Sequence, residues 1–242
     1  MREIKPNPLL RLLPSLTDVA FLLPLIFVFA GLEGTRTLLG DGDTGWHIRA
    51  GEWMLAHGTV ARQDMFSYTM PGQPWYAWEW LWDVAFAWLH LRWGMAAVVV
   101  ASLLVVCLTS ALLYRLAYRR CGNPLVAIVV SGLGTAGASI HWFARPHLFT
   151  MLFLVVFLSI LERVREGRTG LLWTLPALTL LWTNLHGGFF VGIVVLGLYA
   201  MGDVLMALLA AEGEERMPSL RRAALYLRSE EHTSELQSHL NL

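Results

Sequence analysis

The stretch that decides the fold class lies near the middle of the chain and reads Met95-Ala-Ala-Val-Val-Val-Ala-Ser-Leu-Leu-Val-Val-Cys-Leu-Thr-Ser-Ala-Leu-Leu-Tyr-Arg-Leu116. Its single charged side chain, Arg115, stands next to its end. The run is as long as the ~20 apolar residues that a helix needs to cross the core of a bilayer. We therefore expect a membrane-spanning helix here.

Further apolar runs of this kind lie on both sides of it, at residues 19–39, 125–143, 148–161, 171–185 and 188–211. Of the 242 residues, 56% are hydrophobic and only 15% are charged, as is typical of a polytopic membrane protein and not of a soluble domain. The sequence thus predicts an all-α fold, a polytopic bundle of transmembrane helices. The first run is too long for the core of a signal peptide, so we interpret it as a retained anchor.

The end of the chain has a different character. Its last residues, 228–242, begin with Arg228-Ser-Glu-Glu-His-Thr-Ser-Glu-Leu-Gln-Ser-His239, which looks like the in-frame translation of a sequencing-library adapter. A translated adapter carries no information about the native fold. We expect the native chain to run to about Leu227 and to continue beyond it, so that residues 1–227 are the N-terminal part of a longer transmembrane domain.

Basic side chains gather in four clusters: Arg2/Lys5/Arg11, Arg115/Arg119/Arg120, Arg163/Arg165/Arg168 and Arg216/Arg221/Arg222. The positive-inside rule places all four, and the N-terminus, in the cytoplasm. That is possible only if the first outer loop, residues 40–94, does not cross the membrane. Within this loop apolar residues recur at helical spacing from Trp75 to Trp93, which favours an amphipathic helix lying in the membrane interface. The alternative is a short, tilted span that is broken from the next one at Gly94.

Directly behind the first apolar run stands the acidic segment Asp41-Gly-Asp-Thr-Gly-Trp-His47. Carboxylates and an imidazole at a membrane surface suggest chemistry on a substrate that lives there, so this segment is the best candidate for an active site. In the alternative interpretation Asp43 only caps the helix that begins at Thr44. That helix is amphipathic and ends at Gly58, so it forms a second surface helix of the outer loop.

With this topology, the turns around Arg145 and around residues 184–188 should meet the acidic segment on the outer face. Arg145 breaks the positive-inside pattern, which makes it the arginine best suited to an anion such as a phosphate. Its alternative role is to close the turn or to pair with Asp41. His147 and His186 are candidate substrate-binding residues, with hydrogen bonding between helices as the alternative. The glycines of residues 184–188 favour close helix packing over phosphate binding.

Composition excludes several other classes of function. The 18 basic and 18 acidic residues balance, so no polyanion such as nucleic acid is indicated. The two cysteines, Cys107 and Cys121, suggest neither a disulfide framework nor a thiolate metal site. No histidine or cysteine spacing indicates a metal, and no cofactor is expected.

Three segments, taken together, resemble the GT-C superfamily of integral-membrane glycosyltransferases, which includes protein mannosyltransferases and the lipid A aminoarabinose transferases. They are the acidic segment that opens a juxtamembrane helix (residues 41–55), a second acidic position before an aromatic helix (Gln73-Pro-Trp-Tyr-Ala-Trp-Glu-Trp80), and a basic end after the next span (residues 112–120). The resemblance covers about residues 15–211 and corresponds to the N-terminal half of the family.

The resemblance implies that a sugar passes from a polyprenyl-phosphate carrier to an acceptor on the extracytoplasmic face, with inversion at the anomeric carbon. Asp43, or less favourably Asp41, would act as general base, Glu79 would supply the second acidic position, and Arg145 would suit the phosphate leaving group. His47, together with the two outer histidines, would bind substrate. The family often has Asp-Glu where this chain has Asp43-Thr44, and some members have a later carboxylate at the position of His147.

We expect such an enzyme in a plasma membrane of the bacterial type, and we expect the chain as given, a fragment, to be inactive. A transporter-like protein is an alternative, but it would carry polar groups at mid-membrane depth, and Asp203 is the only acidic residue well inside a predicted span. A noncatalytic membrane scaffold, with the outer loop as its docking surface, is the other alternative.

Overall fold

The computed structural model describes residues 13–31, 34–209 and 216–238, and within these ranges the chain is all-α with no strand. The α-helices are α1 (Leu16–Gly31), α2 (Asp43–His57), α3 (Trp80–Cys121), α4 (Pro124–Ala138), α5 (His147–Arg165), α6 (Thr174–Leu185), α7 (Phe190–Leu209) and α8 (Arg216–Ser238). Short 3-10 helices are η2 (Gly34–Leu39), η3 (Ser139–His141), η4 (Thr169–Trp173) and η5 (Gly187–Phe189). The predicted fold class is confirmed.

Four segments of the described chain are long and apolar enough to cross a membrane: α3, α4 with η3, α5, and η5 with α7. The chain is therefore a multi-pass membrane protein. Two expected spans are shorter than we predicted. The first does not continue to residue 39, because α1 ends at Gly31 and a 3-10 helix begins at Gly34, whose φ of 68° favours glycine. The fifth is reduced to the 12 residues of α6.

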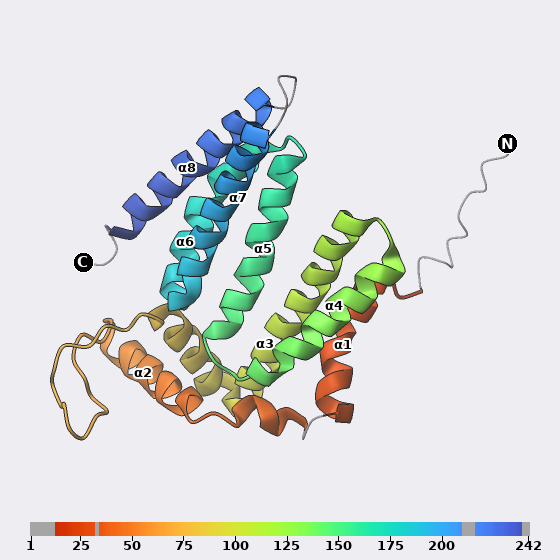
Figure 1. Cartoon of the computed structure of the whole chain (residues 1–242). Helices are drawn as coiled ribbons and strands as arrows, with labels where there is room; N and C mark the ends of the chain where they lie inside the picture. The colour runs from red at the N-terminus through yellow and green to blue at the C-terminus, as the bar shows by residue number, and fades with distance from the viewer. Residues whose placement is uncertain (1–12, 32–33, 210–215, 239–242) are drawn as a thin grey trace.

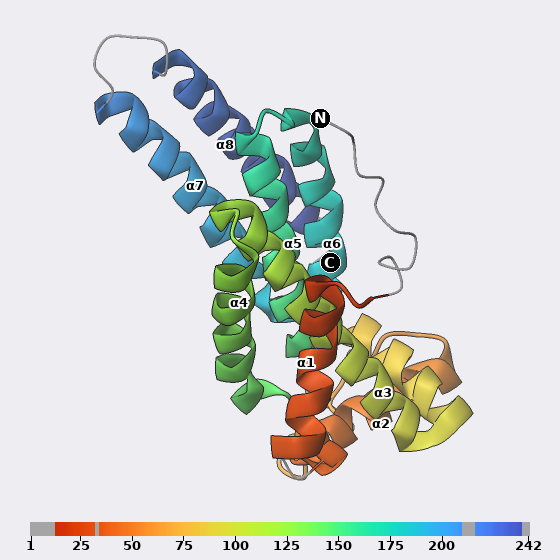
Figure 2. The ribbon, with the colours of Figure 1, turned by 90° about the vertical axis from the view of Figure 1, so that its right-hand side faces the viewer.

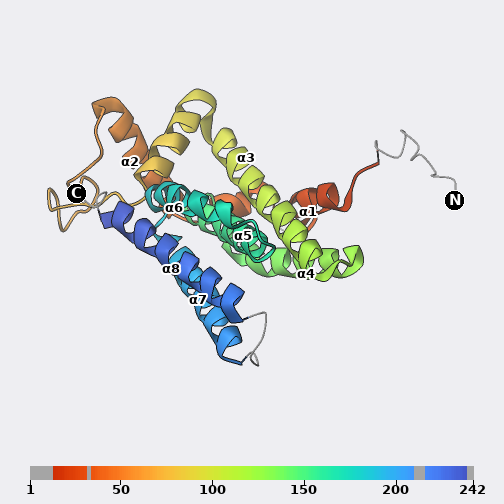
Figure 3. The ribbon, with the colours of Figure 1, turned by 90° about the horizontal axis from the view of Figure 1, so that it is seen from above.

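Helix α3 consists of two helical parts that meet at Gly94. This residue has φ 71° and ψ −172°, a conformation outside the helical region that a side chain would strain. Residues 80–93 therefore form a helical segment of their own, which turns sharply away from the rest of α3 (Figures 2 and 3). This segment begins at Trp80, five residues later than the aromatic pattern indicated, and it packs against α2.

The helices run alternately up and down, so the connections fall at two ends of the bundle (Figure 1). One end, which we call the α2 end, carries η2, α2, residues 58–93, and the turns that contain η3 and η5. Aromatic side chains join residues 80–93 to α5 and α6: Trp82 stacks on Phe86, Phe86 contacts Phe149 edge to face, and Phe153 lies against Trp182. This aromatic cluster fixes the α2 end to the membrane helices.

The opposite end, which we call the arginine end, holds three of the four basic clusters. Arg119 lies 3.5 Å from Glu166, and Arg120 pairs with Glu162. Asp203 is 2% exposed and accepts from Arg222 at 3.0 Å, with Arg165 at 3.5 Å. The fourth basic cluster, at residues 2–11, lies outside the described residues.

Candidate functional site

The acidic segment forms a turn in which the side chain of Asp41 accepts a hydrogen bond from the backbone at the start of α2. The backbone N–H of Asp43 donates to Asp41 Oδ1 at 2.9 Å, so it satisfies one of the donors that a helix start leaves open. Helix α2 begins at Asp43 itself, and no side chain caps it from position 42. The interpretation of Asp43 as a cap is therefore wrong, because Asp41 takes that role. The Asp43 side chain stays 45% exposed.

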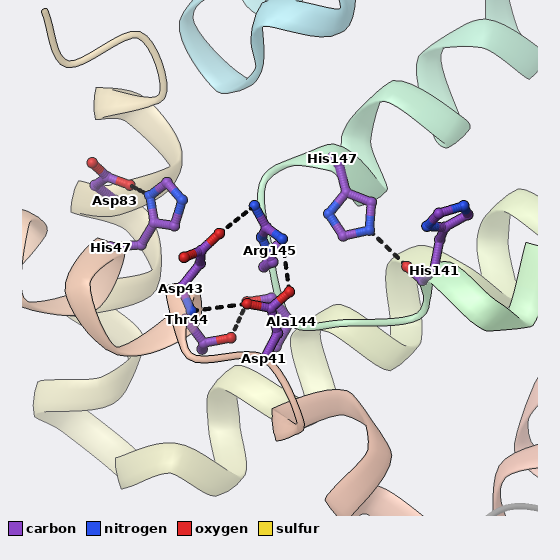
Figure 4. Close-up of polar contacts among 9 residues, drawn as sticks. All are labelled: Asp41, Asp43, Thr44, His47, Asp83, His141, Ala144, Arg145 and His147. Atoms are coloured by element: carbon purple, nitrogen blue, oxygen red, sulfur yellow. Dashed lines mark hydrogen bonds and ion pairs between the residues drawn. The ribbon is translucent and has the colours of Figure 1, made fainter.

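Arg145, from the turn before α5, lies between the two carboxylates. Its Nη1 donates to Asp41 Oδ2 at 2.7 Å, and its Nη2 lies 2.6 Å from Asp43 Oδ2 (Figure 4). The pairing of Arg145 with Asp41 is thus present, and Arg145 also pairs with Asp43. Two further hydrogen bonds hold the turn in place: Thr44 Oγ1 donates to the carbonyl of Ala144 at 3.2 Å, and the N–H of Ala144 donates to the carbonyl of Leu38 at 2.7 Å.

The two carboxylates differ in their surroundings. The hydrogen bond from the Asp43 N–H, with the hydrogen bond and charge of Arg145 as smaller contributions, holds the pKa of Asp41 below its ordinary value. A carboxylate with a lowered pKa is a poorer proton acceptor. The assignment of Asp43 as the base, ahead of Asp41, stays a prediction; the Asp43 side chain is 45% exposed and pairs with Arg145.

His47 pairs with a carboxylate that we did not assign to the site. Its Nδ1 lies 2.7 Å from Asp83 Oδ1, and the two side chains are 4% and 2% exposed (Figure 4). Trp46 stacks on the imidazole with ring centroids 3.7 Å apart, and Trp82 covers another side. Asp83 follows Glu79 by one helical turn, and this spacing is the sequence signal that could have identified Asp83 as a residue of the site. The spacing could not show that His47 on α2 is its partner.

Glu79 stands just before α3, at the edge of the same cluster. Burial, with a contribution from the negative charge of Asp83, raises the pKa of Glu79, although the nearby His47 and the backbone N–H of Gly187 oppose the shift. The next residue, Trp80, donates from Nε1 to Asn184 Oδ1 at 2.7 Å and so ties the start of α3 to the end of α6. Glu79 therefore faces both the α2 helix and the η5 turn.

His186 forms a hydrogen-bond chain between α5 and α6. The backbone N–H of Gly188 donates to its Nδ1 at 3.0 Å, so Nδ1 is an acceptor and the ring proton is on Nε2. Thr150 Oγ1 lies 2.7 Å from the same nitrogen and accepts from Trp182 Nε1 at 3.0 Å. A Cβ at Gly188 would lie 2.4 Å from Thr150 Oγ1, so this glycine serves close packing.

His147 lies between this chain and the Arg145 turn. Its Nε2 donates to the carbonyl of His141 at 2.6 Å (Figure 4). Its ring centroid is 6.4 Å from that of His186. The interhelical hydrogen bonding considered as an alternative is thus observed for His186, whereas His147 bonds to the turn that precedes its own helix.

The environment of His186 predicts a pH-dependent stability. Burial, with smaller contributions from the charges of His147 and Arg145, lowers the pKa of His186 from 6.5 to about 4. The unfolded chain then binds more protons than the folded chain between these values, so stability is complete above pH 6.5 and falls as the pH is lowered toward 4. Thermal unfolding in detergent from pH 7 to 4 measures this loss. The variant His186→Asn, which keeps an acceptor near Nδ1 and does not titrate, should lose less stability than the wild type. Equal losses in both proteins would contradict the assignment.

All the residues proposed from sequence lie at the α2 end. They come from three parts of the chain: the outer loop, the turn at the start of α5 and the turn after α6. Asp41 and Asp43 share Arg145, while His47 and Glu79 lie with Asp83, and His147 lies near His186. Within the described residues, no group of three or more histidine, cysteine, aspartate or glutamate side chains is placed to hold a metal ion. The arrangement combines an exposed carboxylate, a guanidinium suited to an anion, and a neutral imidazole donor.

No protein-family model, curated protein or solved structure matches the chain. Its function therefore has to be inferred from the geometry of this site and from the membrane-spanning helices that carry it.

Proposed function

We propose that the chain belongs to a membrane glycosyltransferase of the GT-C type, which transfers a sugar from a polyprenyl-phosphate donor to an acceptor at the α2 end. The observation that carries the proposal is the position of Arg145 between Asp41 and Asp43. Such a transfer needs a base for the acceptor and a cation for the departing phosphate. Both groups lie side by side at one end of a bundle of membrane-spanning helices.

In the proposed reaction, the acceptor hydroxyl oxygen attacks the anomeric carbon and gives its proton to Asp43. The bond between that carbon and the phosphate oxygen breaks on the opposite side of the sugar, and the polyprenyl phosphate leaves with the bonding electron pair. This single displacement inverts the anomeric carbon. Arg145 stabilises the negative charge on the leaving phosphate, for which it exchanges its contact with Asp43, while Asp41 keeps it in place.

His186 can supply a hydrogen bond to the substrate without adding charge. Because the pKa of His186 is lowered to about 4, its ring is neutral near pH 7 and carries a proton on Nε2 that can be donated to a sugar hydroxyl. A neutral donor binds the sugar without competing with Arg145 for the phosphate. His147, whose ring centroid lies 6.4 Å from that of His186, would be a further contact, whereas His47 is already paired with Asp83.

A cavity beside the Arg145 turn suits the lipid part of the donor. It has a volume of about 180 Å³ and lies between α3, α4 and α5. Trp142 and Leu148 line it at the end nearest Arg145, and Val106 and Leu113 line it deeper in the bundle. An isoprenoid chain placed here would bury apolar surface while its phosphate meets the guanidinium.

The orientation proposed for this enzyme follows from the two ends of the bundle. With the arginine end in the cytoplasm, the positive-inside rule is satisfied and the α2 end faces outward, in a plasma membrane of the bacterial type. Residues 80–93 and α2 would then lie in the outer interface, where the exposed Trp88 and Trp93 meet the lipid headgroups. The N-terminus would be cytoplasmic.

The choice of sugar donor tests the proposal. The assay uses the product of the source gene, placed in proteoliposomes. Radiolabelled sugars are offered either on polyprenyl phosphate or on a nucleotide. We expect transfer from the polyprenyl-phosphate sugars alone, because Arg145 meets a single phosphate next to an apolar cavity. Transfer from the nucleotide sugars, or no transfer from any donor, would overturn the proposal.

A further inference from the structure

A second cavity lies at the arginine end, far from the candidate active site. It is a groove of about 200 Å³ between α3 and α5. Its walls are apolar, with Leu112 and Leu116 on one side and Val156 and Ile160 on the other. Ser159 and three arginines, Arg115, Arg119 and Arg163, complete the lining. The groove thus combines an apolar interior with three guanidinium groups.

The charges of these arginines are poorly balanced within the described part of the chain. Arg119 lies 3.5 Å from a Glu166 that is itself 52% exposed. Arg115 and Arg163 make no ion pair among the described residues, and the buried Nε of Arg163 has no hydrogen-bond partner there. The other carboxylate nearby, Glu162, is taken by Arg120 and by the hydroxyl of Tyr199.

We propose that this groove binds the phosphate headgroup of an anionic phospholipid, with one acyl chain against the apolar walls. The groove lies at the end of two membrane-spanning helices, where lipid headgroups meet a bundle. Guanidinium groups bind phosphate oxygens through paired N–H donors, and basic pockets between transmembrane helices hold anionic headgroups. A phospholipid covers the apolar walls as well as the charges, whereas free phosphate covers the charges alone. This inference does not depend on the proposed sugar transfer.

Lipid retention on the purified full chain tests the proposal. The chain is stripped of lipid in detergent and titrated with phosphatidylglycerol or phosphatidylcholine, and bound lipid is counted by native mass spectrometry. We expect a preference for phosphatidylglycerol that falls roughly tenfold or more in the double variant Arg115→Gln/Arg163→Gln. Arg168→Gln is the matched control, because Arg168 lies at the same end outside the groove, and it should leave the preference unchanged.

A second variant tests the shape of the groove without changing its charges. Ser159→Phe narrows the groove and keeps all three arginines, so it should weaken phosphatidylglycerol binding as well. Melting temperatures measured without lipid show whether each variant is folded, and the Ser159 variant decides the question if the double variant is not. The proposal is overturned if wild type binds both lipids equally, if Arg168→Gln loses as much as the double variant, or if inorganic phosphate displaces the lipid completely.

Discussion

The Asp43→Asn variant should lose between roughly a hundredfold and ten-thousandfold of the rate of sugar transfer, the range typical for removal of a general base. Asparagine has nearly the same shape but cannot accept the proton of the acceptor hydroxyl. Its effect on stability should be small, because the pairing of Asp43 with Arg145 is partly exposed and such pairs contribute about 1 kcal/mol or less. The measurement is the initial rate from a polyprenyl-phosphate sugar in proteoliposomes.

Asp64→Asn is the matched control for this substitution. Asp64 lies between α2 and α3 at the same end, where its Oδ1 accepts from the backbone N–H groups of Phe66 and Ser67 at 2.9 Å each. Asparagine keeps that acceptor, so transfer should stay near the wild-type rate. A normal rate in Asp43→Asn would refute the assignment of the base, and an equal loss in both variants would trace the effect to the loop.

The largest expected loss of stability follows from His47→Leu. This substitution leaves the Asp83 carboxylate, which is 2% exposed, without its partner, and an uncompensated buried charge costs about 3–5 kcal/mol. The double variant His47→Leu/Asp83→Leu removes both polar groups and should recover most of that loss. The free energy of unfolding, measured by denaturant titration in micelles with tryptophan fluorescence as the signal, checks both values.

Glu52→Gln on the same helix provides the comparison for the buried pair. Glu52 contacts Arg49 and His90, but Arg49 is 73% exposed, so breaking these contacts should cost about 1 kcal/mol or less. If His47→Leu costs no more than Glu52→Gln, the pair of His47 with Asp83 does not hold α2 to α3. If the double variant is as unstable as the single one, packing of the imidazole matters more than its charge partner.

The helices could be predicted from sequence because length and apolar composition are local properties. The same reasoning overestimated the length of the first span, since average hydropathy does not register that α1 ends at Gly31 and that a 3-10 helix begins at Gly34. Alternation of the helices was enough to bring Asp41, Arg145 and His186 to one end, because an even number of bundle helices, α3 with α4 and then α5 with α6, separates these connections and so places them on the same side. Side-chain partners required more than topology.

Two details of the site show why topology alone did not predict the side-chain partners. The start of α2 is shifted by one residue from the expected position, and the helix-capping role moves from Asp43 to Asp41, because the turn is closed by a hydrogen bond that spans two residues. Asp83 was not among the site residues proposed from the sequence. Its meeting with His47 depends on how closely two helices approach, which the order of residues in each helix does not reveal.

That close approach is set by Gly51. A Cβ there would lie 1.9 Å from the backbone oxygen of Asp83, so α2 and residues 80–93 touch backbone to backbone. They form one closely packed unit, which carries Asp43 and is joined to the rest of α3 at Gly94. Arg145 belongs to the bundle on the other side. The carboxylate and the guanidinium thus belong to two different units, α2 with residues 80–93 and the turn before α5, and the pair of Asp43 with Arg145 joins these units.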